Sequence, residues 1–338
     1  KRKRKEKVVD SDGSATDTPE TGAGPSLQLM KDIAHEKSLR SFSRLFGLDV
    51  KKARIDSFSR EDLTHCLSAL SKIHEGIIKL EKDAYFNFFT HKFKSIIPLL
   101  KDRKMVRSFV DLGEYVHLVV RLWEMMDADA IAARFGNDFE NGFNFLSEKY
   151  HLKHVTDELD SFWKSDSLRG LHVVSDMQFT IKPREEHNLL KSILVENHLT
   201  LYTVRHAASV VSIIRNGFQP FPTETPRLGL GRGLVFYNTI LGAFDEYCDK
   251  ALYGNPREDP DDKTPIYIFQ VSVVCGAILE LAKVEKQLTN VPPPYHTICQ
   301  LPNGYINKKD SSHPKPGRYI LSDPSQASVV RFAKLDLQ

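Results

Sequence analysis

Residues 199–218 have the sequence LTLYTVRHAASVVSIIRNGF, which indicates a strand followed closely by a helix. The first six are mostly apolar, aromatic or β-branched, a composition typical of a buried strand. The apolar residues from Val210 to Ile214 fit one short helix, with His206 in the turn before it. Gly217 is expected to end this helix, because glycine readily adopts the left-handed conformation found at helix C-termini.

Further segments toward the C-terminus share the composition of this strand and are separated by clusters of Gly, Pro, Asn and Asp. They are GLVFY (233–237), IYIFQVSVV (266–274), RYILS (318–322) and ASVVRFAKLDL (327–337). We therefore expect a mixed, sheet-dominated domain over residues 171–338.

The segment from about Ser26 to Trp163 has helical periodicity instead. Apolar residues recur at three-and-four spacing, as in Leu63, Leu67, Leu70, Ile73, Ile77 and Leu80. Ser59 and Asp62 resemble a helix N-cap pair. Further helices are predicted over 84–97, 104–126 and 128–146, which gives an all-α domain of five to seven helices over 26–165. The fold class is α+β, with the helical domain first.

Composition limits the class of protein. The chain has 338 residues, of which 41% are apolar and 27% charged, which is ordinary globular composition and sufficient for two domains. No apolar run approaches the roughly 18–20 residues of a membrane span, and there is no secretory signal. We expect a soluble intracellular protein without membrane contact. Because the chain begins with Lys1, we also expect it to be a fragment.

The positive charge is concentrated at the N-terminus. KRKRKEK (1–7) carries six basic residues and one acidic residue, so the tail contributes +5 to a total of +3 and the remainder carries −2. The tail is predicted to mediate nuclear import or contact nucleic acid through Lys1, Arg2, Lys3, Arg4 and Lys5. Residues 1–25 are expected to be a disordered tail and linker, because 8–25 have few large apolar residues.

The cysteines show no metal-binding spacing. Cys66, Cys248, Cys275 and Cys299 form no CxxC motif and are too few to stabilise a chain of this length by disulfides. We expect free thiols, a reducing compartment and no metal site.

In order, the segments of the second half resemble the catalytic domain of the poly(ADP-ribose) polymerases (PARPs), which are ADP-ribosyltransferases. These segments are TLYTVRHAASVVSIIRNGF, LGLGRGLVFYNTILGAFDEYC, TPIYIFQVSVVCG, PPPYHTI and GRYILSDPSQASVVRF. The helical half, with SREDLTHCLSALSKI and KMVRSFVDLGEYVHLV, is similar to the regulatory helical domain of the DNA-dependent members. The resemblance covers about 26–338. It implies an NAD⁺-binding fold and a nuclear role linked to chromatin and DNA damage.

The residues expected to carry the chemistry differ from the family pattern. The family uses a His-Tyr-Glu triad to displace nicotinamide from NAD⁺, and the corresponding positions here are Thr203, Val235 and Arg318. Arg318 in place of the glutamate is the most damaging change, because a guanidinium stays positively charged and would face a cationic transition state. Asp323, five residues further on, is expected to lie too far away to replace the glutamate.

A few family features are retained. Tyr247 matches an aromatic residue that stacks on nicotinamide, and Gly231 and Gly233 precede the second strand. Val204 occupies the position of the glycine that binds the carboxamide. These four residues are the candidate NAD⁺ contacts, if NAD⁺ binds. The structural alternatives stay open: Tyr247 as a core aromatic, the glycines as turn residues, and Phe244 as a side chain that fills the nicotinamide pocket.

Three functions remain in competition. The first is an inactive PARP-like pseudoenzyme, without a cofactor, that serves as a nuclear scaffold or protein-interaction module. The second is a weak mono-ADP-ribosyltransferase that uses NAD⁺ to modify protein or nucleic acid. The third is a nucleic-acid-linked role of the basic tail. Localisation is expected to be nuclear, or otherwise cytoplasmic.

Overall fold

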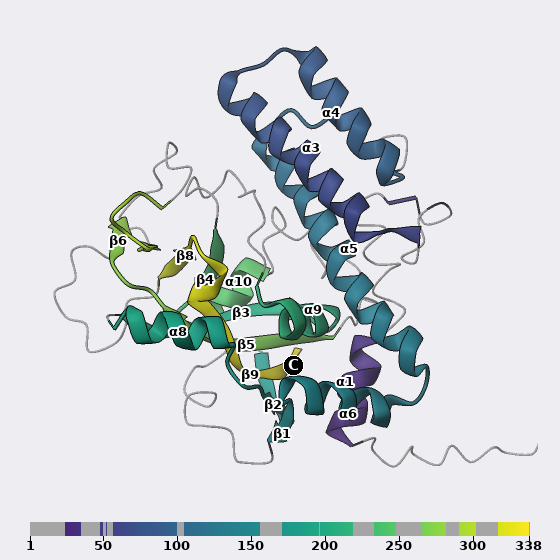
Figure 1. Ribbon diagram of the computed structural model, residues 1–338, viewed down its shortest axis with the longest axis vertical. Coiled ribbons are helices and arrows are strands. Elements are labelled where there is room, and N and C mark those ends of the chain that lie inside the picture. The colour runs from purple at the N-terminus through teal and green to yellow at the C-terminus, as the bar shows by residue number, and fades with distance from the viewer. Residues whose placement is uncertain are drawn as a thin grey trace, which may run out of the picture.

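The computed structural model describes a helical half followed by a sheet half (Figure 1). The residues it describes are 24–34, 48–49, 52, 57–99, 105–155, 171–195, 197–218, 233–247, 265–281, 291–301 and 317–337. The predicted α+β class, with the helices first, is confirmed. The basic tail lies outside the described residues.

The described residues of the helical half form five helices. They are α1 (Pro25–Ile33), α3 (Arg60–Lys79), α4 (Asp83–Ile96), α5 (Phe109–Phe135) and α6 (Phe139–Tyr150). Figure 1 shows α3, α4 and α5 projecting away from the sheet, with α1 and α6 beside the lower end of α5. The predicted N-cap of α3 is confirmed, because Ser59 Oγ accepts from the backbone N–H of Asp62 and Asp62 accepts from the backbone N–H of Ser59.

The predicted boundary between helices 104–126 and 128–146 is wrong. Instead α5 continues to Phe135, because 126–135 (MDADAIAARF) is rich in good helix formers. The break comes at Gly136, which has a φ of 57°. Asp138 then caps α6 by accepting from the backbone N–H of Asn141.

One nine-stranded sheet forms the second half, in the order β1-β2-β9-β5-β3-β4-β8-β7-β6. The strands are β1 (Lys153–Val155), β2 (Leu171–Thr180), β3 (His198–His206), β4 (Leu234–Tyr237), β5 (Ile266–Val274), β6 (Ile278–Leu281), β7 (Thr297–Gln300), β8 (Arg318–Leu321) and β9 (Ala327–Leu337). Neighbours are antiparallel except β6 and β7. The five predicted strands are confirmed as β3, β4, β5, β8 and β9. The shorter or more polar β1, β2, β6 and β7 were not predicted, and β1 lies inside the range expected to be helical.

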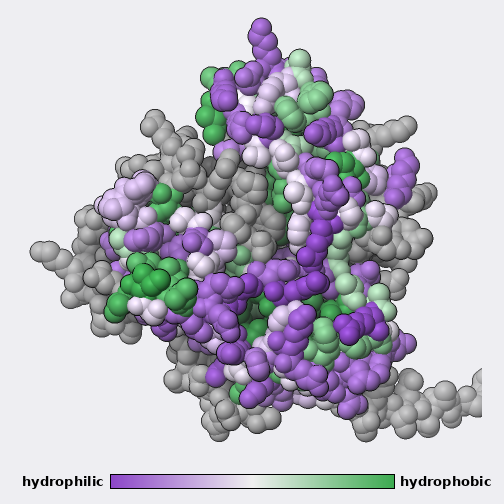
Figure 2. Space-filling model, viewed as in Figure 1, coloured by the Kyte–Doolittle hydropathy of each residue, from purple (hydrophilic) through white to green (hydrophobic). Residues whose placement is uncertain are grey.

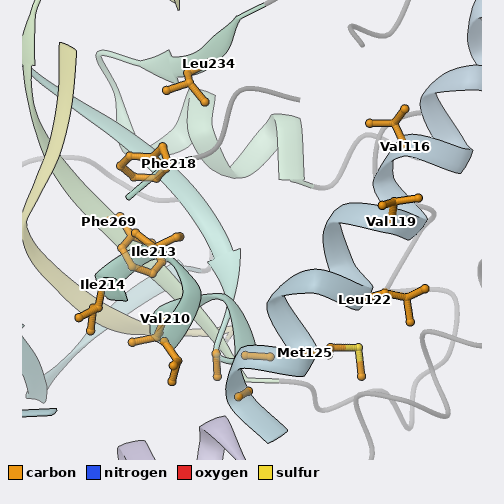
Figure 3. Close-up of a cluster of buried hydrophobic side chains, with 14 of the residues drawn as sticks. Val116, Val119, Leu122, Met125, Val210, Ile213, Ile214, Phe218, Leu234 and Phe269 are labelled. Carbon is orange, nitrogen blue, oxygen red and sulfur yellow. The ribbon is translucent and has the colours of Figure 1, made fainter. Parts of the chain in front are cut away.

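Helices cover the sheet to different degrees. The helix α9 (Ala208–Asn216) is buried over most of its length and ends at Gly217, with a φ of 72°, as predicted. Figure 3 shows its side chains Val210, Ile213 and Ile214 in the apolar cluster shared with α5 and the sheet. The helix α8 (Glu185–Ile193) is peripheral, and Figure 2 shows an apolar patch over it. Leu189 and Ile193 are 64% and 65% exposed.

Buried carboxylates of the helical half are paired across to the sheet half. Asp32 on α1 accepts from Tyr267 Oη of β5 at 2.8 Å and lies 2.9 Å from Lys334 Nζ of β9. Glu124 Oε2 on α5 accepts from Ser209 Oγ of α9 at 2.7 Å. These contacts satisfy charges that would otherwise be costly to bury.

The Asp32 contacts predict a large effect on stability. We expect Asp32→Ala to lower the free energy of unfolding by roughly 3 kcal/mol, because it removes the shared partner of the buried Tyr267 hydroxyl and the partly buried Lys334 ammonium. Urea denaturation measures the change. The matched control is Glu75→Ala, which removes the surface pair with Lys72 and should cost less than about 0.5 kcal/mol. Equal losses in the two variants would contradict this account.

Candidate functional site

The three expected triad positions lie on three strands of the sheet. Thr203 is on β3, Val235 on β4 and Arg318 on β8. In the β4–β8 pair Tyr237 is opposite Arg318, so Val235 and Arg318 are two residues apart along the ladder and share a face. On β3, Tyr202 pairs with Tyr237 and therefore shares the face of Arg318. Thr203 is the next residue, so its side chain projects from the opposite face of the sheet. The structure thus brings Val235 and Arg318 together on one face without the side chain of Thr203.

Arg318 is a buried charge. The residue is 6% exposed, and its Nε and Nη2 atoms have no hydrogen-bond partner among the residues that the structure describes. A guanidinium does not lose its proton in proteins, so this position holds a positive charge. A group of that charge cannot stabilise a developing cation.

Asp323, the acidic residue considered as a substitute at the expected triad, lies apart from it. It lies beyond the end of β8 and caps the short 3₁₀ helix Pro324–Gln326. Its Oδ1 accepts from the backbone N–H and the hydroxyl of Ser325, at 2.8 and 2.7 Å. The carboxylate therefore has a local structural role.

Tyr247, the last residue of α10 (Ile240–Tyr247), packs in a second apolar cluster. It is 4% exposed, and its ring stacks at 6.4 Å on that of Phe244. Val204 belongs to the same cluster and is fully buried. This arrangement favours the core interpretation of Tyr247 and places Phe244 beside it.

His206 is the last residue of β3, so its expected position in a turn is wrong. The Tyr247 hydroxyl lies 3.2 Å from both of its ring nitrogens. Burial lowers the pKa of His206 well below its usual value, and the positive charges of Arg121 and Arg205 lower it further. The neutral ring can therefore accept from Tyr247.

Gly233 is required by the close approach of two strands. A Cβ at this position would lie 2.5 Å from the carbonyl oxygen of Leu321 and 2.7 Å from Ile320 Cγ2. Its role in strand packing is sufficient to explain the glycine. Gly231 lies outside the described residues.

The Pro-Pro-Tyr-His segment shapes a loop. His296 Nδ1 accepts from the backbone N–H of Ala277 at 3.1 Å, and Thr297 Oγ1 donates to the Cys275 carbonyl at 2.8 Å. Gln326 donates to Thr297 Oγ1 at 3.2 Å. These bonds give the segment a structural role.

Among the described residues, Cys66, Cys275 and Cys299 are buried thiols that form no disulfide. Burial raises the pKa of Cys66 and Cys275 to about 12, so these thiols stay protonated. Within the described residues, no group of three His, Cys, Asp or Glu side chains is placed to hold a metal ion. No helix in the same residues has the length and hydropathy of a membrane span.

Two neighbours of Arg318 were not identified from the sequence. Tyr237 on β4 and Gln300 on β7 are its direct cross-strand partners. Tyr237 is the last residue of the predicted strand GLVFY (233–237), but nothing in the local pattern indicated that Gln300 belongs to the same site. Only strand pairing reveals this relation.

Comparison with known proteins supports the helical half of the resemblance. Residues 25–150 match the family model of the poly(ADP-ribose) polymerase regulatory domain, a range that runs from α1 to the end of α6. The chain matches no curated protein. The helical half is thus similar to a PARP regulatory domain, while the catalytic resemblance of the sheet half rests on the motifs quoted above.

The pKa of His206 predicts how stability depends on pH. Because the folded chain disfavours the protonated ring, the free energy of unfolding should fall as pH drops below about 6.5. This residue contributes a slope of up to about 1.4 kcal/mol per pH unit. Urea unfolding across this pH range should show a shallower dependence for His206→Gln than for the wild type. The exposed His65→Gln variant is the control, and an unchanged slope in His206→Gln would refute the assignment.

Proposed function

We propose that this chain is a PARP-like pseudoenzyme that does not transfer ADP-ribose and acts as a protein-interaction module. The observation that carries the proposal is Arg318, a buried positive charge where the family has its catalytic glutamate. Loss of positioned acid–base assistance alone costs about 10²- to 10⁴-fold in rate, and a charge of the wrong sign adds to that cost.

The packing around Tyr247 supports the same proposal. A nicotinamide ring needs free space against the aromatic face that it stacks on. Here Phe244 stacks on Tyr247, and Val204 packs in the same buried cluster. Two of the candidate NAD⁺ contacts, Tyr247 and Val204, are therefore engaged in core packing.

The proposed organisation has three parts. Residues 1–25 are a basic tail and linker, 26–165 a regulatory-like helical domain and 171–338 an ADP-ribosyltransferase-like domain. The family match over 25–150 supports the middle part. The partners proposed are proteins in a nuclear, chromatin-associated complex, with the tail as a nucleic-acid contact.

Transfer of labelled ADP-ribose from NAD⁺ to the full chain tests the absence of activity. We expect wild type to acquire no more label than Arg318→Gln, because neither has a carboxylate at this position. Label acquired by wild type and abolished in Tyr247→Ala would instead establish the weak mono-ADP-ribosyltransferase. Calorimetry with a non-hydrolysable NAD⁺ analogue separates the remaining cases: binding indicates a ligand-binding pseudoenzyme, and no binding a scaffold.

Deletion of residues 1–7 tests the role of the tail. The deletion should reduce nuclear accumulation and flatten the salt dependence of DNA binding, because six basic side chains are removed. Deleting residues 8–14, a segment of equal length without basic residues, is the matched control. Equal behaviour of the two deletions would exclude the tail as the nuclear or nucleic-acid determinant.

A further inference from the structure

A row of polar side chains crosses the sheet at Arg318. Gln300 of β7 and Tyr237 of β4 pair with Arg318 from either side. Side chains at paired positions share a face, with Cβ atoms about 4.5–5.5 Å apart. Three residues whose side chains end in hydrogen-bond donors, an amide, a guanidinium and a phenol, thus stand at adjacent positions on one face.

Arg318 differs from the other buried charged side chains that the structure describes. Asp32 contacts Lys334, Arg121 contacts Glu124, and Asp127 contacts Arg60. Arg318 makes no ion pair with a described residue, and its Nε and Nη2 are buried without a partner. Burial of an uncompensated charge is strongly unfavourable, so proteins pair or ligate such groups.

The two unpaired nitrogens determine the shape of a suitable partner. Nε and Nη2 form one edge of the planar guanidinium and donate in parallel. This edge matches two oxygens of a single oxyanion in a bidentate contact. Gln300, paired with Arg318 on one side, adds an amide donor, which suits a phosphate because a phosphate has more acceptor oxygens than a carboxylate.

We propose that Arg318 anchors a binding site for a phosphate group, flanked by Gln300 and Tyr237. The site stands at the position expected for the family's catalytic glutamate. The glutamate would stabilise a cation, whereas Arg318 prefers an anion. This inference goes beyond the proposed function, since the site would bind phosphate whether or not the chain transfers ADP-ribose.

Calorimetric titration of the full chain with inorganic phosphate, at constant ionic strength set with sodium chloride, tests the site. We expect wild type to bind phosphate. Arg318→Lys should bind roughly tenfold or more weakly, because a lysine loses the bidentate geometry. Arg318→Met should not bind. Arg107→Met, which removes an exposed arginine paired with Asp83, should bind like wild type.

Thermal unfolding provides a second measurement of phosphate binding, which also serves for variants that are unsuitable for calorimetric titration. Phosphate should raise the melting temperature of wild type and Arg107→Met by mass action, with no rise in Arg318→Met. An equal rise in acetate would overturn the assignment to phosphate. Absence of any rise in wild type, or an equal rise in Arg318→Met, would overturn the site itself. Neither measurement involves NAD⁺, so a failure here is distinguishable from a failure of the proposed function.

Discussion

Pairing of buried charges across the two halves is the constraint on which the rest of the structure depends. A buried carboxylate is tolerated only when donors surround it, and the helical half buries Asp32, Glu124 and Asp127. Their partners include side chains of β5, β9 and α9 in the sheet half. Separation of the two halves would therefore expose apolar surface and also leave donors and acceptors without partners. The helical half and the sheet stabilise each other in one arrangement.

The requirement that a buried charge have a partner also applies to Arg318. The other buried charges among the described residues satisfy the requirement for a partner within the chain, and Arg318 does not. A charge in this condition is retained at a cost in stability, which suggests a role in binding rather than in packing. Under the catalytic resemblance expected from the sequence, this position on β8 would correspond to the family's glutamate.

Local features of the sequence were sufficient for much of the fold. Strong signals such as the Ser59–Asp62 cap, the strand 266–274 and the glycine that ends α9 were each located correctly, because propensity and periodicity act over a few residues. The break inside 104–146 was misplaced, since helix formers continue to Phe135. Strands β6 (ILEL) and β7 (TICQ) were missed, although β4 and β8 of the same length were found from their apolar and aromatic residues.

The sequence by itself determined the α+β class, the main helices and strands, and the residue types at the expected triad positions. These depend on local composition and on the order of motifs. Only the tertiary structure decided which side chains share a face. It separated Thr203 from Val235 and Arg318, placed Gln300 and Tyr237 beside Arg318, and packed Phe244 against Tyr247. The physical reason is that strand register and burial are set by contacts between residues far apart in the chain, which no local pattern encodes.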